Sequence, residues 1–213
     1  MNVNYQKKLD DIINKIETNL ETPTLLLHSC CAPCSTYVIK YLSNYFKITV
    51  LYYNPNITID LEYEKRKNEQ EEFIKKINST LKNEVYFLEG EYNSKDFFNA
   101  IKGYENCGEG SIRCDKCFEL RLDYTGKICK EKNFDYFTTT LSISPLKNSN
   151  KLNEIGEIIE KKYNKKYLYS DFKKKEGYKN STIISKLYNL YRQNYCACIF
   201  SKIESEKRGG NSE

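Results

Sequence analysis

The sequence predicts an α/β protein built on a Rossmann-like parallel sheet with helices on both faces. Apolar runs of strand length alternate with longer segments of helical periodicity along most of the chain. The 213 residues are also enough to bury a sizeable core. We therefore expect a single domain over residues 1–203, ending in a C-terminal helical region, and a flexible basic tail over 204–213.

Five short runs are expected to form the sheet. The first is centred on three consecutive leucines, which is typical of a strand buried on both faces. The second ends at a turn signal, Asn54-Pro55-Asn56. The expected strands lie at 24–28, 48–53, 85–88, 136–140 and 167–169.

Helices are expected between and around these strands. Leu9, Ile13 and Ile16 recur at helical spacing in the first helix, and Pro33 suits the first turn of the second. The expected helices lie at 4–20, after 33, and at 60–81, 94–101, 115–132, 149–163 and about 183–191.

Composition limits the possible environment and partners. No apolar run reaches the length of a membrane span, and the polar amphipathic N-terminus is unlike a signal peptide. Nine cysteines without an export signal predict the reducing cytoplasm, where clustered thiols bind metals or carry electrons. The net charge of +5 is a mild sign of an anionic partner such as nucleic acid, although a solvated lysine face explains it equally well.

Seven of the nine cysteines fall in three short clusters. In a fold of this class, ligands sit beyond the carboxyl ends of the strands. The first cluster directly follows the first expected strand, so its thiols should lie at that edge, together with the loop 141–145. The clusters are Cys30-Cys31-x-x-Cys34, Cys114-x-x-Cys117 and Cys196-Ala197-Cys198.

The first two clusters together offer five sulfurs as metal ligands. Two cysteines in a C-x-x-C spacing can hold one metal or cluster, and the helix start at Cys114 favours the thiolate form. Five sulfurs satisfy an iron–sulfur cluster with one to spare, and two such pairs also satisfy tetrahedral zinc. The adjacent Cys30 and Cys31 are an awkward chelate for one tetrahedral ion, but spacing alone leaves both metals open.

The Cys196-Ala197-Cys198 pair suits electron exchange. Its Cα atoms can come within disulfide range, although so small a ring carries strain. A strained, accessible disulfide is easily reduced, which suits a two-electron store. The alternative is that both thiols ligate the metal. Of the two remaining cysteines, Cys129 is expected to be a buried structural thiol, while Cys107 is ambiguous.

Several other polar residues are candidates for the site. His28, the only histidine, could act as a general acid or metal ligand, or be a hydrogen-bonded structural residue. Asp115 could bind a second metal, orient water or cap its helix. Tyr191, Arg192 and Gln193, followed by Tyr195, can stack on or hydrogen-bond a nucleobase, although tyrosines at helical spacing also serve packing.

Five motifs in order resemble those of the cobalamin-independent epoxyqueuosine reductases, the QueH family. The resemblance covers about residues 20–202, and its first and last motifs are the most specific. The motifs lie at 28–34 (HSCCAPC), 113–117 (RCDKC), 138–145 (TTTLSISP), 177–181 (GYKNS) and 191–198 (YRQNYCAC).

The resemblance implies an oxidoreductase of tRNA processing. It implies the last step of queuosine biosynthesis, the reductive removal of the epoxide oxygen of epoxyqueuosine at the wobble position of tRNA. The implied partners are the tRNAs for aspartate, asparagine, histidine and tyrosine, together with an external electron donor. It also implies a HUP-type Rossmann-like fold and no cobalamin.

The resemblance further implies roles for individual cysteines. Cys34 is a candidate ligand of a second metal ion, iron or zinc, beside the iron–sulfur cluster, and one nominal cluster ligand would then serve that ion. The implied ligands of a [4Fe-4S] cluster are Cys30, Cys31, Cys114 and Cys117, and the implied redox-active disulfide joins Cys196 and Cys198.

The chemistry of this reaction agrees with these residues, and three rival functions make different demands. Deoxygenating an epoxide takes two electrons and two protons, and a metal can polarise the C–O bond. The lysines at 173–175, those of the tail and Arg208 are candidate phosphate contacts.

The rival functions predict other features. A zinc-binding nucleic-acid module would be colourless, and a thiol–disulfide oxidoreductase would need only one C-x-x-C. A nucleotide-activating enzyme would need a glycine-rich loop after the first strand, which 29–33 cannot supply.

Overall fold

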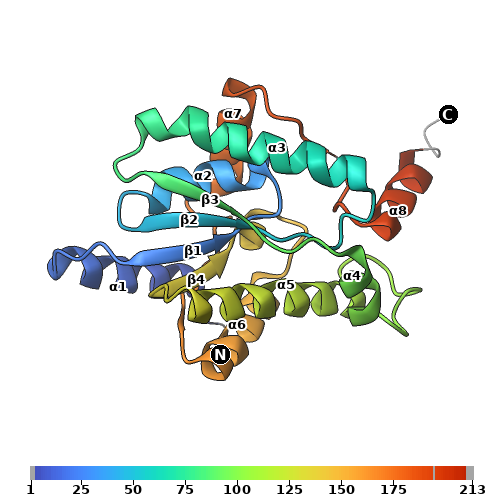
Figure 1. Ribbon diagram of the computed structural model, residues 1–213, viewed down its shortest axis with the longest axis horizontal. Helices are drawn as coiled ribbons and strands as arrows, with labels where there is room; N and C mark the ends of the chain where they lie inside the picture. The colour runs from blue at the N-terminus through green and yellow to red at the C-terminus, as the bar shows by residue number, and fades with distance from the viewer. Residues whose placement is uncertain (1–2, 194, 210–213) are drawn as a thin grey trace.

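A computed structural model describes residues 3–193 and 195–209, and its centre is a five-stranded sheet (Figure 1). All neighbouring strands are parallel, in the order β3-β2-β1-β4-β5. The expected α/β class with a parallel sheet is confirmed. The strands are β1 (Thr24–His28), β2 (Lys47–Tyr52), β3 (Val85–Glu89), β4 (Tyr136–Thr139) and β5 (Lys166–Tyr167).

Helices cover both faces of the sheet. In Figure 1, α2, α3 and α7 lie above the sheet, and α5 and α6 lie below it. Within the described residues, none of the helices has both the length and the apolar character of a membrane span. The α-helices are α1 (Tyr5–Thr18), α2 (Ala32–Leu42), α3 (Asp60–Ile77), α4 (Ser94–Ala100), α5 (Ile112–Glu131), α6 (Ser149–Tyr163), α7 (Gly177–Leu187) and α8 (Ile199–Gly209), and the 3-10 turns are η1 (Asn78–Thr80) and η2 (Thr140–Ile143).

The alternation of side chains along β1 divides the core into two. Leu25 and Leu27 pack in the cluster formed with α1, α2 and α3, whereas Leu26 packs with α5 and α6. Successive residues of a strand point to opposite faces, so three adjacent leucines serve both layers. All three are fully buried, which explains why this central strand has no polar residue between Thr24 and His28.

Strand register brings three loops to one edge of the sheet. His28, the last residue of β1, is level with Leu51 of β2 and Thr139 of β4. The segments that follow are tied together, because Asn54 Nδ2 donates to the Ser29 carbonyl at 2.9 Å and Cys30 N donates to Thr140 Oγ1 at 3.4 Å. The first cysteine cluster therefore lies where the fold class predicts a ligand site.

The C-terminal region differs from the expected boundaries. Helix α7 begins at Gly177, earlier than expected, because this glycine lets the helix start against Phe172 and Tyr37, where a Cβ would overlap both. The expected flexible tail begins at 204, but α8 continues to Gly209. The Glu204 carboxylate is held by Arg113 on α5 at 2.8 Å, which fixes this helix to the domain. Residues 210–213 of the expected tail lie outside the described residues.

Close packing of α6 on β5 generates a stability prediction. A Cβ on Gly156 would overlap the ring of Tyr167. Gly156→Ala should therefore lower the free energy of unfolding by about 1–3 kcal/mol, measured by urea denaturation. The matched control is Gly108→Ala, where the added Cβ meets nothing within 4 Å and stability should change by no more than about 0.5 kcal/mol. Equal stability of the two variants would contradict the packing described here.

Candidate metal centre

Three thiols converge at the carboxyl edge of the sheet. The Sγ atoms of Cys30, Cys31 and Cys34 all lie within 4.8 Å of one another, and those of Cys30 and Cys31 are 3.9 Å apart. Cys31 is the N-cap of α2 and Cys34 lies in its first turn, so the helix start fixes two of the three. Thiolates bound to one tetrahedral ion through bonds of about 2.3 Å stand roughly 3.8 Å apart. This three-thiol group can therefore hold one metal ion.

The three thiols differ in acidity. The thiols of Cys31 and Cys34 donate to the sulfur of Cys30, and with Lys147 and Arg121 nearby they hold the pKa of Cys30 well below its usual range. The same contact raises the pKa of Cys31 to about 12 and that of Cys34 well above its usual range. In the metal-free group, Cys30 therefore loses its proton more readily than Cys31 and Cys34 do. A metal ion would displace the remaining protons.

A second thiol group lies at the start of α5. Cys114 and Cys117 line a small pocket of about 20 Å³ together with Cys196 and Cys198. Burial raises the pKa of Cys114, so the prediction that the helix start favours its thiolate form is wrong for the metal-free protein. Burial also raises the pKa of Cys117 to about 12. Cys198 directly precedes α8, and its Sγ accepts a hydrogen bond from Ser201 N at 3.4 Å. The structure therefore brings the C-x-x-C pair of α5 beside the C-terminal cysteine pair.

The buried guanidinium of Arg121 links the two thiol groups. This side chain is 1% exposed, and it donates to Cys117 Sγ at 3.8 Å and to Asn54 Oδ1 at 2.9 Å. Burial opposes its charge, but electrostatic attraction to the sulfurs of Cys117, Cys30 and Cys196 offsets this and raises its pKa. It has no carboxylate partner in the described part of the chain. A buried cation of this kind requires negative charge on the sulfurs around it.

His28 is a structural residue of this edge. It is fully buried, with Nδ1 at 2.8 Å from Thr139 Oγ1 and Nε2 at 3.1 Å from the Tyr53 carbonyl and 3.3 Å from Arg121 Nε. Burial, with Arg121 adding to it, lowers the pKa of His28 to about 3. The imidazole is therefore neutral near pH 7, and both of its nitrogens are engaged by protein groups. Of the roles considered for His28, general acid, metal ligand or hydrogen-bonded structural residue, the structural role fits this environment.

The other candidates from the sequence take ordinary positions. Asp115 lies within the first turn of α5, whose N-cap is Ser111, so it is not the cap. Burial raises the pKa of Asp115. Cys129 is fully buried in the core and donates to the Phe134 carbonyl, as expected for a structural thiol. Cys107 is half-buried in the loop before α5.

A cavity of about 270 Å³ connects the first thiol group with the surface. Cys196 lines both this cavity and the small pocket at α5, so it stands between the two thiol groups. Of the expected substrate-binding residues, Arg192 and Gln193 line the cavity, as does Tyr195. Tyr191 is not among the lining residues; it lies on the surface, with its ring 3.8 Å from Lys65 Nζ.

Comparison with known proteins places the chain in a family. The model of the family described as epoxyqueuosine reductase QueH matches residues 25–204. The chain belongs to the QueH family. An epoxyqueuosine reductase QueH of Staphylococcus epidermidis is 41% identical over 204 residues, which cover 95% of this chain and 86% of that protein.

Further QueH relatives come from other bacteria. An epoxyqueuosine reductase QueH of Streptococcus pyogenes is 40% identical over 93% of this chain and 78% of its own length. One of Thermotoga maritima is 35% identical over 87% of this chain and 93% of its own length. Similarity over most of this chain and most of each relative confirms the resemblance that the motifs predicted.

Two cations at the site of this QueH family member were not identified from the sequence. Arg121 lies two turns after Cys114 on α5, among other charged residues, and Lys147 follows η2. Burial would lower the pKa of Lys147, but electrostatic attraction to the sulfurs of Cys196, Cys30 and Cys34 raises it above its usual range. The only available signal was their closeness in sequence to two of the QueH motifs.

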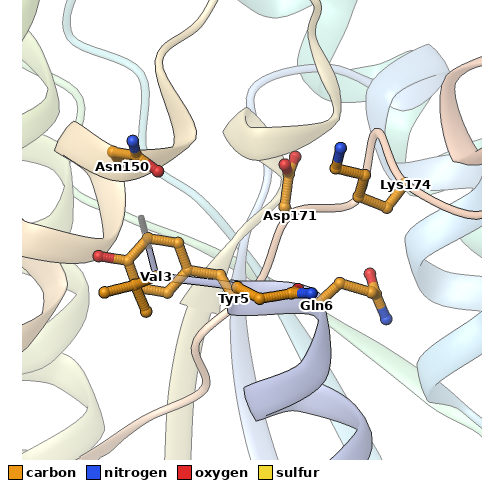
Figure 2. A pocket seen from close by; sticks show the side chains of 7 residues that line it. Val3, Tyr5, Gln6, Asn150, Asp171 and Lys174 are labelled. Carbon is orange, nitrogen blue, oxygen red and sulfur yellow. The ribbon is translucent and has the colours of Figure 1, made fainter. Parts of the chain in front are cut away.

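The expected phosphate-binding lysines lie at another cavity. This cavity, of about 320 Å³, lies beside the start of α1, and none of its lining residues is a cysteine (Figure 2). Lys174 lines it, but Lys173 pairs with Asp171 at 3.0 Å and Lys175 with Asp10 at 2.7 Å. Two of the three lysines are therefore engaged by carboxylates of the same chain, and their contact with phosphate stays a prediction.

The unequal acidity of the thiols gives a prediction for the metal-free, reduced protein. Alkylation requires the thiolate, which predominates above the pKa of the group. Because the pKa of Cys30 is lowered, its alkylation rate should rise less between pH 7 and 9 than that of an ordinary thiol. The rates at Cys31 and at Cys129, with pKa values raised to about 12, should still be rising there.

The measurement is iodoacetamide labelling followed by mass spectrometry of each cysteine. The protein unfolded in urea serves as the control, since all its thiols should then titrate near about pH 8.5. Parallel pH profiles for Cys30 and Cys31 in the folded protein would contradict the proposed sharing of protons.

Proposed function

We propose that this protein is an epoxyqueuosine reductase that acts on tRNA. It removes the epoxide oxygen of epoxyqueuosine at the wobble position and leaves queuosine. The observation that carries the proposal is the single cavity that Cys30, Cys31 and Cys34 share with Cys196. A thiol group that can hold a metal ion and a thiol of the proposed redox pair thereby line the same cavity, in a chain that belongs to the QueH family.

We assign the metal cofactor as a [4Fe-4S] cluster held by Cys30, Cys31, Cys114 and Cys117. Cys34 then contributes to a second ion, iron or zinc, beside it. The proposal is supported by the number of thiols and by the buried Arg121 and the half-buried Lys147, which lack carboxylate partners in the described residues. In the metal-free structure, Cys114 and Cys117 lie in the second thiol group and not in the group formed by Cys30, Cys31 and Cys34. Thiolate-ligated clusters carry the negative charge that these cations require. When bound, the group supplies electron transfer and polarisation of a C–O bond.

Cys196 and Cys198 are assigned as the redox-active pair. Converting an epoxide to an alkene and water consumes two electrons and two protons. Oxidation of two thiols to one disulfide releases two of each, so one turnover oxidises one pair. An external reductant must then restore both thiols. The Ser201 hydroxyl accepts a hydrogen bond from Cys198 Sγ and donates one to the carbonyl of Cys196, which holds the pair at the start of α8.

The substrate assignment follows from the geometry of the anticodon loop. The wobble nucleotide is already single-stranded, so it can leave the loop and enter a cavity without breaking a duplex. We expect the acceptors to be the tRNAs for aspartate, asparagine, histidine and tyrosine, and the protein to act in the cytoplasm, where tRNA is found. Residues 1–203 would form one catalytic domain of HUP-type fold.

The direct test uses protein purified without oxygen and tRNA that carries epoxyqueuosine. With a chemical reductant present, nucleosides from the digested tRNA should show queuosine replacing epoxyqueuosine, measured by mass spectrometry. Iron-loaded protein that leaves epoxyqueuosine unchanged would overturn the assignment.

The redox pair can be tested separately from the metal. Cys196→Ser should keep the iron content and visible spectrum of the wild type but abolish repeated turnover, because the disulfide can no longer form. Cys129→Ser is the matched control, since its hydroxyl can still donate to the Phe134 carbonyl away from the cavity, and its activity should be unchanged. Wild-type turnover by Cys196→Ser would remove the pair from the mechanism.

A further inference from the structure

The rim of the thiol cavity carries an exposed tyrosine backed by an arginine. Tyr178, at the start of α7, is 42% exposed, and the Cζ atom of Arg192 lies 5.7 Å from the centre of its ring. Both residues line the cavity. Ser185 Oγ accepts a hydrogen bond from Arg192 Nη1 at 3.2 Å, which holds the guanidinium in place. The pair presents an aromatic ring and a positive charge at the cavity mouth.

A second pair of the same kind lies next to it in the chain. Tyr191 is 39% exposed, and Lys65 of α3 holds its Nζ 3.8 Å from the ring centre. The backbone N–H of Tyr191 donates to Glu69 Oε1 at 2.7 Å, which fixes the segment on α3. Neither Lys65 nor Arg192 has a carboxylate oxygen within ion-pair distance in the described part of the chain. Both charges are therefore available to an anionic ligand.

A third pair lies deeper in the cavity. The ring of Tyr195 lies 5.4 Å from Arg66 Cζ, and this guanidinium is only 1% exposed. Arg66 also interacts electrostatically with Cys31. Two of the pairs thus present exposed rings, at Tyr178 and Tyr191, and the third lines the cavity that also contains Cys31.

We propose that Tyr178 with Arg192, and Tyr191 with Lys65, form a stacking platform for the nucleotides that flank the wobble nucleotide. The wobble base itself passes Tyr195 on its way to the thiols. The inference rests on the proposed function for the identity of the RNA. Aromatic rings stack on any exposed base, and neighbouring cations contact the phosphates between bases, so alternating rings and cations match single-stranded RNA.

The test measures binding of a fluorescent, unmodified anticodon stem-loop RNA to the metal-loaded protein by anisotropy. Tyr178→Ala should weaken binding by about 5- to 100-fold, the effect of losing one base–aromatic stack. Tyr178→Phe should bind within about twofold of wild type, because stacking does not need the hydroxyl. Tyr86→Ala is the matched control, since Tyr86 is 56% exposed on β3 and lines none of the cavities described here. It should bind like wild type.

The cations are tested through the salt dependence of the same binding. Lys65→Ala should reduce the slope of log affinity against log salt by roughly 0.7, the value for one phosphate contact on a single strand. Lys40→Ala, which removes an exposed lysine of α2, should leave the slope unchanged. Thermal unfolding of each variant checks that the fold is intact. If Tyr178→Ala is unstable, RNA binding by Arg192→Gln provides a second test of the residues at the cavity rim.

The outcomes separate this inference from the proposed function. If Tyr178→Ala and Arg192→Gln bind the stem-loop RNA as tightly as Tyr86→Ala does, the platform is overturned, even if the wild type converts epoxyqueuosine. Weakened binding by these variants, with no conversion of epoxyqueuosine by the wild type, would support an RNA platform and reject the reductase assignment.

Discussion

The arrangement of the site depends on one buried cation, Arg121. Its guanidinium reaches from α5 to the ends of β1 and β2, where it contacts His28 and Asn54, and it touches Cys117 on its own helix. A buried guanidinium is costly unless hydrogen bonds and negative charge surround it. Because the described residues offer it no carboxylate, the nearby sulfurs are the groups that can provide that charge once they lose their protons. The same cation therefore positions the loops and favours the anionic state that a metal requires.

The parallel sheet brings the segments that Arg121 contacts to one edge. Strands β1, β2 and β4 end at the same level of the sheet. The first cysteine cluster, the Asn54 turn and η2, which follow these strands, therefore lie at one edge. The C-terminal segment then closes over this edge, because Arg113 holds Glu204 of α8 and Phe97 packs against Phe200. Segments far apart in sequence thereby place Cys196 within reach of both thiol groups.

The sequence predicted most of the frame and much of the site. The bounds of β1 and α6 agree fully, because uninterrupted leucines and a regular helical repeat leave few alternatives. The convergence of Cys30, Cys31 and Cys34 followed from a loop at a strand end. The role of Arg121 could not be predicted, because its contacts with His28 and Asn54 span 93 and 67 residues of sequence. The start of α7 was missed for a similar reason, since it depends on tertiary packing at Gly177.

The central claim is that thiols of the first loop and of α5 bind one iron–sulfur centre. Quantifying iron, acid-labile sulfide and zinc in protein purified without oxygen tests it most directly, for the wild type and for Cys30→Ala and Cys114→Ala. We expect about four sulfide ions and at least as many iron ions per chain, with both lost in either variant. A colourless protein with a single zinc ion and no sulfide, or a Cys114→Ala variant that keeps its full sulfide content, would contradict the account.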